Sequence, residues 1–215
     1  MGEKITPQQM LKAIVAVCDT IEAQKEYLSE LDGAIGDGDH GVNMAKCFRE
    51  VKKKLPECEG KECEGILKAV GMVVLNSVGG AMGALYGTFF LKLAQASSGK
   101  KALQLNDLVE MFQMAEQGII DIGKAKVGDK TLIDTLSPAI RSLEDSRDKD
   151  RPLSEALMAF KDAAKKGMES TKDMIAKIGR ASRLGERTIG HQDAGATSCY
   201  LILSSMARGL TNASS

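Results

Sequence analysis

The 215-residue chain contains no tryptophan, and aromatic residues make up only 4% of it. Single-stranded nucleic acids stack on aromatic side chains, so this composition argues against a base-stacking surface. The chain also lacks an excess of charge of either sign, because 29 Lys and Arg residues balance 29 Asp and Glu residues. Proteins that bind nucleic acids usually carry a basic excess. We therefore expect no nucleic-acid partner.

Cysteine is sparse and irregularly spaced. The chain has an odd number of these residues, namely Cys18, Cys47, Cys58, Cys63 and Cys199. No second pair of Cys or His residues follows Cys58 and Cys63 at zinc-finger spacing. Disulfide frameworks belong mainly to small secreted proteins, and the N-terminal stretch MGEKITPQQM lacks the apolar run of a signal peptide. The sequence therefore predicts free thiols and a cytoplasmic location.

One long stretch has no charged residue. It covers the 23 positions between Lys68 and Lys92, which is long enough to span a bilayer. The adjacent glycines Gly79 and Gly80 would interrupt a single spanning helix, because glycine is unfavourable in a helix interior. We therefore predict two buried helices that break at these glycines, and no membrane association.

Apolar residues recur at helical spacing through most of the chain, and no run alternates as a strand does. The first helix is expected from Pro7, after a capping box that begins at Thr6. Seven more are expected over about 41–55, 63–77, 83–96, 106–122, after Thr131, from Pro152, and over about 194–208. The charged stretch 144–151 is expected to be a solvated loop. We predict a single all-α domain over residues 1–215.

Polar, glycine-rich segments occur in four places, and each precedes an expected helix. These segments are 36–41, 79–83, 128–131 and 190–195. In an up-and-down helical bundle, alternate loops lie at the same end. We therefore expect the four segments to line one mouth of the bundle.

Three aspartates, Asp32, Asp37 and Asp39, fall within eight residues and are expected in a loop. Carboxylates this close repel one another unless a cation neutralises them, and Mg²⁺ favours carboxylate and phosphate oxygens. An EF-hand is excluded, because a loop that starts at Asp37 places Phe48 where a bidentate Glu is required. Helix capping by Asp39 is the structural alternative, but it explains one aspartate and not three.

The glycine-rich segment 79–83 has two interpretations. Main-chain amides at the start of a helix favour a phosphate group, whereas glycines between two helices also permit close packing. Both histidines of the chain, His40 and His191, lie in the glycine-rich segments, which favours a shared site over separate structural roles. No Ser-His-Asp or Cys-His arrangement is recognisable. The apparent lack of a general base fits phosphoryl transfer, in which positioning and charge neutralisation dominate.

With these motifs, the chain resembles the nucleotide-binding L subunit of dihydroxyacetone kinase along nearly its whole length. The order and spacing of the motifs together carry the resemblance. They read IGDGDHGVNM (35–44), SVGGAMGALYGTFF (77–90), GKAKVGDKT (123–131) and GRASRLGERTIGHQDAGATS (179–198). The resemblance implies a closed barrel of eight antiparallel amphipathic helices, with the nucleotide site at one end.

The resemblance also implies the residues of that site. Asp32, Asp37 and Asp39 would hold two Mg²⁺ ions against the phosphates of ADP or ATP, and Asp37, Asp39 and Arg180 would be catalytic. The implied nucleotide contacts are His40, Gly41, Val42, Asn43, Gly80, Ala81, Met82, Gly123, Leu132, Arg180, Asp193, Ala194 and Gly195. Many members of the family have a hydroxyl residue at the position of Met82, so a side-chain contact to phosphate is missing here.

Two partner subunits are implied as well. In the family, a K subunit holds dihydroxyacetone covalently through its own histidine, which accounts for the missing base. The resemblance favours the phosphoenolpyruvate-dependent version, in which bound ADP is rephosphorylated by a phosphohistidine on an M subunit. Two alternatives remain open: an ATP-dependent kinase subunit for another small ketose, and a nucleotide-loaded regulatory binding protein. The sequence also leaves open whether the chain forms a homodimer.

Overall fold

The computed structural model describes residues 3–211, which are mostly helical and contain no β-sheet. Nine α-helices form in this range: α1 (Pro7–Ala23), α2 (Lys25–Ile35), α3 (His40–Lys54), α4 (Cys63–Ser77), α5 (Gly80–Ala96), α6 (Leu105–Gly123), α7 (Ile133–Asp148), α8 (Leu153–Ser170) and α9 (Ala194–Thr211). Three 3₁₀ helices accompany them: η1 (Leu55–Cys58), η2 (Thr171–Asp173) and η3 (Arg180–Thr188). The predicted all-α class is confirmed.

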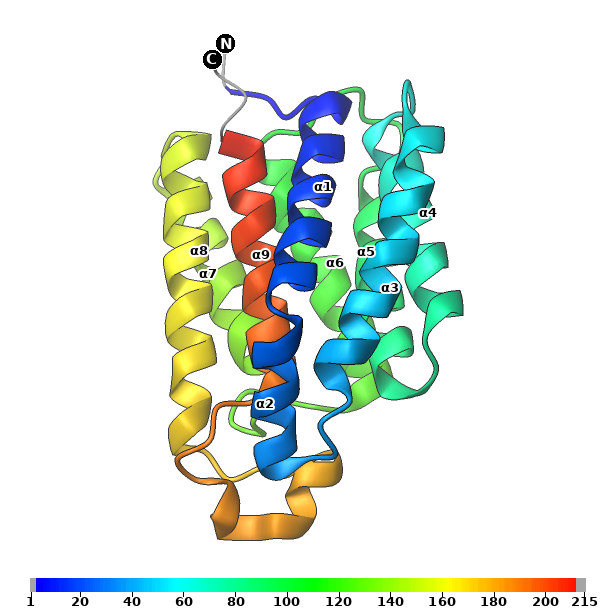
Figure 1. The fold of residues 1–215 in the computed structure, drawn as a ribbon. Helices are drawn as coiled ribbons and strands as arrows, with labels where there is room; N and C mark the ends of the chain where they lie inside the picture. Colours follow the sequence, from blue (N-terminus) through cyan, green and yellow to red (C-terminus); the bar gives the residue numbers. More distant parts are fainter. Residues whose placement is uncertain (1–2, 212–215) are drawn as a thin grey trace.

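The helices form a closed ring of antiparallel rods (Figure 1). Helix α2 continues downward from α1 past a kink at Gln24, whose main-chain N–H still donates to the Thr20 carbonyl at 3.0 Å. Because α1 and α2 act as one bent rod, the nine helices make eight rods. Each rod packs on the next, and α9 returns to pack on α1. The chain therefore alternates direction around the ring, and every second connection lies at the same end.

Phenylalanine side chains fill the centre of the ring. Phe89 and Phe90 lie edge to face with ring centroids 5.1 Å apart, and Phe112 and Phe160 lie with centroids 4.9 Å apart. Phe48 extends this cluster toward α3, and all five of these side chains are buried. Burying one such side chain stabilises the fold by about 1.5–3 kcal/mol. The interior is thus a packed core, so a binding site has to lie at an end of the barrel.

Three details of the structure differ from the sequence predictions. Helix α2 was not predicted, and it places Asp32 in a helical last turn and not in a loop. Its only buried residues are Leu28 and Ile35, so it lacks the apolar stripe that reveals the other helices. The stretch 144–151, expected as a loop, is helical as far as Asp148. Helix α5 starts at Gly80, earlier than expected.

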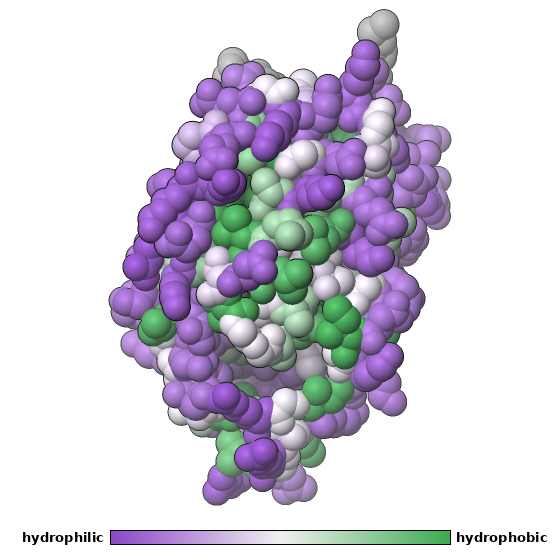
Figure 2. Space-filling model, turned by 90° about the vertical axis from the view of Figure 1, so that its right-hand side faces the viewer, coloured by the Kyte–Doolittle hydropathy of each residue, from purple (hydrophilic) through white to green (hydrophobic). Residues whose placement is uncertain are grey.

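The uncharged stretch forms two helices, as predicted, because α4 ends at Ser77 and α5 begins at Gly80. Hydrophobic residues gather on the face that these helices share, which lies to the right in Figure 1 and faces the viewer in Figure 2. Met72 and Leu75 of α4 are exposed there. Within residues 3–211, none of the helices combines the length and the apolar character that crossing a membrane requires.

Candidate functional site

Four connections meet around one cavity of about 390 Å³ at the end of the barrel that is lowest in Figure 1. They join α2 to α3, α4 to α5, α6 to α7, and α8 to α9, so the expectation that the polar segments share one mouth is confirmed. The predicted site residues that line this cavity are Asp32, Asp37, Asp39, His40, Asn43, Gly80, Ala81, Met82, Leu132, Arg180, Asp193, Ala194 and Gly195.

The remaining predicted residues lie beside the cavity. Gly41 is buried in the first turn of α3, where a Cβ would collide with the Lys25 carbonyl oxygen. Val42 follows it and is 47% exposed. Gly123 is the last residue of α6, and a Cβ there would lie 3.2 Å from the side chain of Leu85, which does line the cavity.

The acidic cluster consists of Asp32, Asp37 and Asp39, each of which offers a carboxylate oxygen within 4.8 Å of the others. The Asp32 carboxylate accepts a hydrogen bond from the main-chain N–H of His40 at 3.2 Å. Asp39 precedes α3 but makes no side-chain capping bond, and Asp37 pairs with Arg180. A capping hydrogen bond therefore accounts for Asp32, but no capping bond accounts for Asp39. Three close carboxylates in this arrangement fit a hard divalent cation such as Mg²⁺.

The start of α5 presents main-chain amides to the same cavity. No side chain caps this helix, and Gly79 and Gly80 line the cavity with open space where a Cβ would stand. Free N–H groups at a helix start form a ready anion site. Other glycines of the segment serve packing, since a Cβ on Gly83 would collide with the Val78 carbonyl oxygen. The packing interpretation is therefore confirmed for Gly83, and the amides after Gly79 stay a predicted phosphate site.

His40 belongs to a buried hydrogen-bond chain that the sequence did not reveal. Its Nε2 lies 2.8 Å from the Ser198 hydroxyl, which lies 2.6 Å from the Tyr86 hydroxyl. Tyr86 in turn donates to the Gly195 carbonyl at 3.1 Å. Burial lowers the pKa of His40 and raises that of Tyr86. The signal available in the sequence was weak: His40 and Ser198 each fall in a motif segment, but 158 residues separate them.

The expectation that both histidines share the site is wrong for His191. Its side chain is exposed and does not line the cavity. Only its main chain takes part in the local structure, because its carbonyl oxygen accepts a hydrogen bond from the Lys130 ammonium. The polar segment 190–195 therefore contributes Asp193 and the residues after it, and not the histidine.

Asp193 caps α9 at the wall of the cavity. Its carboxylate accepts the main-chain N–H of Ala196 at 2.7 Å, and its own N–H donates to the Thr171 hydroxyl at 3.1 Å. Burial raises the pKa of Asp193 to about 6, although the capping bond and the Lys130 ammonium oppose that effect. The capping carboxyl of α9 is therefore close to neutral at mildly acidic pH, unlike an ordinary aspartate.

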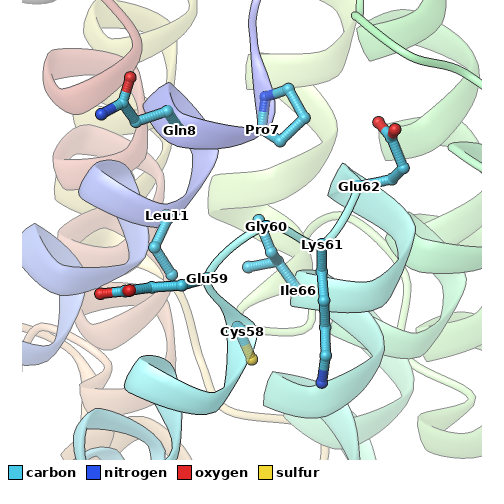
Figure 3. Close-up of a pocket in the computed structure, with 9 residues that line it drawn as sticks. All are labelled: Pro7, Gln8, Leu11, Cys58, Glu59, Gly60, Lys61, Glu62 and Ile66. Carbon is cyan, nitrogen blue, oxygen red and sulfur yellow. The ribbon is translucent and has the colours of Figure 1, made fainter.

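A second cavity, of about 590 Å³, lies at the opposite end, between α1, η1 and the start of α4 (Figure 3). Its charged residues, Glu59, Lys61 and Glu62, point in different directions and do not converge. No residue of the four glycine-rich segments lines it. The convergent polar groups that a binding site needs are therefore at the Asp32 end.

Comparison with known proteins identifies the family of this chain. A family model described as the DAK2 domain matches residues 34–208. The PEP-dependent dihydroxyacetone kinase, ADP-binding subunit, of Escherichia coli (strain K12) is 43% identical over 93% of this chain and 95% of its own. A Listeria innocua protein described as the ADP-binding subunit of PEP-dependent dihydroxyacetone kinase 2 is 41% identical over 90% of each chain. The dihydroxyacetone kinase of C. freundii, solved with AMP-PNP and Mg²⁺, superposes with a TM-score of 0.72 at 23% identity, over 97% of this chain and 35% of that one.

Proposed function

This chain belongs to the DAK2-domain family, and from that premise we propose that it is the nucleotide-binding subunit of a dihydroxyacetone kinase. In this proposal it passes a phosphoryl group from a magnesium-bound nucleotide to dihydroxyacetone held on a separate K subunit. The observation that carries the proposal is the meeting of an acidic cluster and an uncapped helix start at one cavity. The printed names of the relatives, which are ADP-binding subunits, support the choice of nucleotide.

The acidic cluster would hold the metal, with two Mg²⁺ ions shared by Asp32, Asp37 and Asp39. Bound Mg²⁺ would neutralise the phosphate oxygens and help to align them. The main-chain amides of Gly80, Ala81 and Met82 at the start of α5 would receive the phosphates from the other side. The base and ribose would lie against a more apolar wall, formed by Gly123, Leu132, Ala194 and Gly195, with Asn43 and His40 near the phosphates.

Arg180 sits where it can serve two purposes. Its guanidinium pairs with Asp37, and its side chain is two-thirds exposed at the edge of the cavity. Once a cation takes over the charge of Asp37, the guanidinium is free to turn toward the phosphates. An arginine that neutralises transferring phosphate charge is a recurrent part of such sites.

His40 is poorly placed to act as a general base, and we assign that role to the K subunit. The Nε2 atom of His40 is occupied by Ser198, and burial lowers the pKa of the ring. The oxygen of a dihydroxyacetone hydroxyl would attack the terminal phosphorus, the bond to the ADP oxygen would break, and a base of the K subunit would accept the hydroxyl proton. Bound ADP would then be rephosphorylated by a phosphohistidine on an M subunit, as the PEP-dependent relatives suggest.

The proposed location is the cytoplasm. All five cysteines are unpaired and buried, and burial raises the pKa of the Cys47 thiol to about 12. Unpaired cysteines are typical of reducing compartments.

Two measurements test the proposal. Native mass spectrometry of the purified protein should show ADP and magnesium retained on the chain. Dihydroxyacetone phosphate should then form when the K subunit, the M subunit and its phosphoenolpyruvate-driven phosphate donors are added, and not when K and ATP are added alone. Turnover with K and ATP alone would favour the ATP-dependent alternative. Tight ADP binding without turnover in either mixture would favour a regulatory binding protein.

A further inference from the structure

Lys130 buries its charged end in a cage of main-chain carbonyl groups. The residue is 1% exposed, and no carboxylate lies within ion-pairing distance of its Nζ atom among the described residues. The ammonium instead donates to the carbonyl oxygens of Thr171 at 2.6 Å, Met174 at 3.2 Å, Thr188 at 2.7 Å and His191 at 2.5 Å. An ammonium has three N–H donors, so this cage uses all of them. Burial lowers the pKa of Lys130, because it removes water from the charged ammonium.

The local backbone is shaped to deliver this side chain. Lys130 has a φ of +62°, a left-handed conformation that residues other than glycine rarely adopt. The buried carboxylate of Asp134 holds the turn by accepting the main-chain N–H groups of Gly128 at 2.6 Å and Thr131 at 2.7 Å. A strained conformation of this kind persists only where the surroundings enforce it, and such residues cluster at functional sites.

All four carbonyl acceptors belong to one connection, the segment 171–193 between α8 and α9. This connection carries Arg180 over the acidic cluster and leads into Asp193 at the cavity wall. Apart from Lys130, the α6–α7 turn holds it through one main-chain bond, from Lys177 to Asp129 at 3.2 Å, and one partly exposed ion pair between the same residues. The ammonium is therefore the main link between this connection and the turn before α7.

We propose that Lys130 is a positioning residue of the nucleotide site, which fixes segment 171–193 so that Arg180 and the start of α9 face the acidic cluster. The expected change in nucleotide affinity rests on the proposed function. The expected opening of segment 171–193 rests on the geometry alone. Removing the ammonium would leave four carbonyl groups without their donor and would release the segment, whereas the helical core would remain packed. Lys130 borders the cavity, but its ammonium is held in the carbonyl cage, so we expect it to act through the segment.

The first test compares Lys130→Met with Lys172→Met, a matched control on the same segment whose side chain is exposed. Trypsin cleavage after Lys177, Arg180, Arg183 and Arg187 is followed by mass spectrometry, without nucleotide. We expect cleavage of Lys130→Met to be at least about tenfold faster at these sites only, because local opening precedes cleavage. If only about a tenth of the molecules keep the segment in place, the Kd for Mg·ADP rises about tenfold. Lys172→Met should match the wild-type protein in both measurements.

The second test asks whether the ammonium or mere packing is responsible. Lys130→Ala leaves space for n-propylammonium, which carries the missing atoms, and n-propanol serves as the neutral control. Restored trypsin resistance with n-propylammonium alone supports the proposal. Wild-type cleavage rates and Mg·ADP affinity in Lys130→Met would overturn it, and so would global loss of helicity in both variants or equal rescue by n-propanol. Failure of the wild-type protein to bind Mg·ADP would count against the proposed function, while the cleavage comparison would still decide the role of Lys130.

Discussion

The two ends of the barrel are built from the same helices but finish them differently. At the end where α1 begins, uppermost in Figure 1, Thr6 and Gln9 form a capping box on α1 and Asp107 accepts the Gln104 amide at α6, whereas α4 has no side-chain cap. At the other end Asp193 caps α9, but α5 starts without a side-chain cap and Asp39 before α3 makes no capping bond. Only at this second end does an uncapped helix start lie beside an acidic cluster, so that polar groups of both signs are available to a ligand.

Left-handed backbone conformations occur at both ends, but the cavity end collects most of them, among them Gly38, Gly80, Gly128 and Gly179 and the non-glycine residue Lys130. The opposite end has Gly60, Gly99 and Asp150. Loops that turn sharply bring main-chain amides close to a ligand, at the expense of stability. The comparison indicates that the cavity end gives up stability for binding, and it can be tested by changing one end at a time.

The largest effect is expected from Asp39→Asn. Loss of one ligand from the acidic cluster should remove several kcal/mol of charge neutralisation and lower the phosphotransfer rate about 10³-fold. Because Asp32 and Asp37 repel Asp39 when no cation is present, the variant without magnesium should melt at the same or a higher temperature than the wild-type protein. Coupled phosphotransfer assays and thermal melts with and without Mg²⁺ measure both effects. Glu59→Gln at the opposite cavity is the control, and wild-type activity of Asp39→Asn would contradict the metal role.

The sequence predicted the fold well, since helical periodicity depends on neighbouring residues. Helix α2 was not predicted, because only Leu28 and Ile35 are buried and its sequence resembles that of a solvated loop. The site was predictable as a set of segments, because antiparallel topology brings alternate loops together. Its contacts were not, since the pairing of His40 with Ser198 and the carbonyl cage of Lys130 join residues 158 and up to 61 positions apart. Nothing in local sequence spacing encodes such contacts.

The next largest effect concerns the pH dependence of stability at the cavity end. The pKa of Asp193 is raised from 3.8 to about 6 in the folded protein, so the folded state retains a proton that the unfolded chain has lost. The contribution of the protonated Asp193 carboxyl to the free energy of unfolding is complete below about pH 4 and is lost as the pH rises through 6. At about 1.4 kcal/mol per pKa unit, the wild-type protein should lose about 2–3 kcal/mol relative to Asp193→Asn between pH 4 and pH 7.

Urea unfolding of both proteins across this pH range, without nucleotide, measures that difference. Other carboxyl groups titrate in the same range, but their contributions are common to the two proteins and cancel. Parallel stability curves for the wild-type protein and Asp193→Asn would show that the capping carboxyl of α9 is ionised throughout, and that burial does not govern its titration.

A matched pair of glycines compares the two ends directly. Gly80 and Gly60 both have a φ of +75°, and an added Cβ would meet no atom within 4 Å at either position. Gly80→Ala and Gly60→Ala should each lower the free energy of unfolding by about 1–2 kcal/mol through the same backbone strain. Only Gly80→Ala should weaken Mg·ADP binding, by roughly tenfold, the equivalent of about 1.4 kcal/mol. Calorimetric titration with Mg·ADP measures this difference. Equal affinities in the two variants would contradict a role of the Gly80 loop in phosphate binding.

The smallest effect is expected from Thr6→Ala at the start of α1. The Thr6 hydroxyl accepts the Gln9 amide at 3.3 Å, and the Gln9 side chain accepts the Thr6 amide at 2.8 Å. Losing this cap should lower the free energy of unfolding by about 1 kcal/mol, and Thr6→Ser should recover most of it. Mg·ADP affinity should not change, because a packed phenylalanine core separates α1's start from the cavity. A parallel loss of affinity in Thr6→Ala would mean that the core transmits strain between the ends, so that stability and binding are not divided between them.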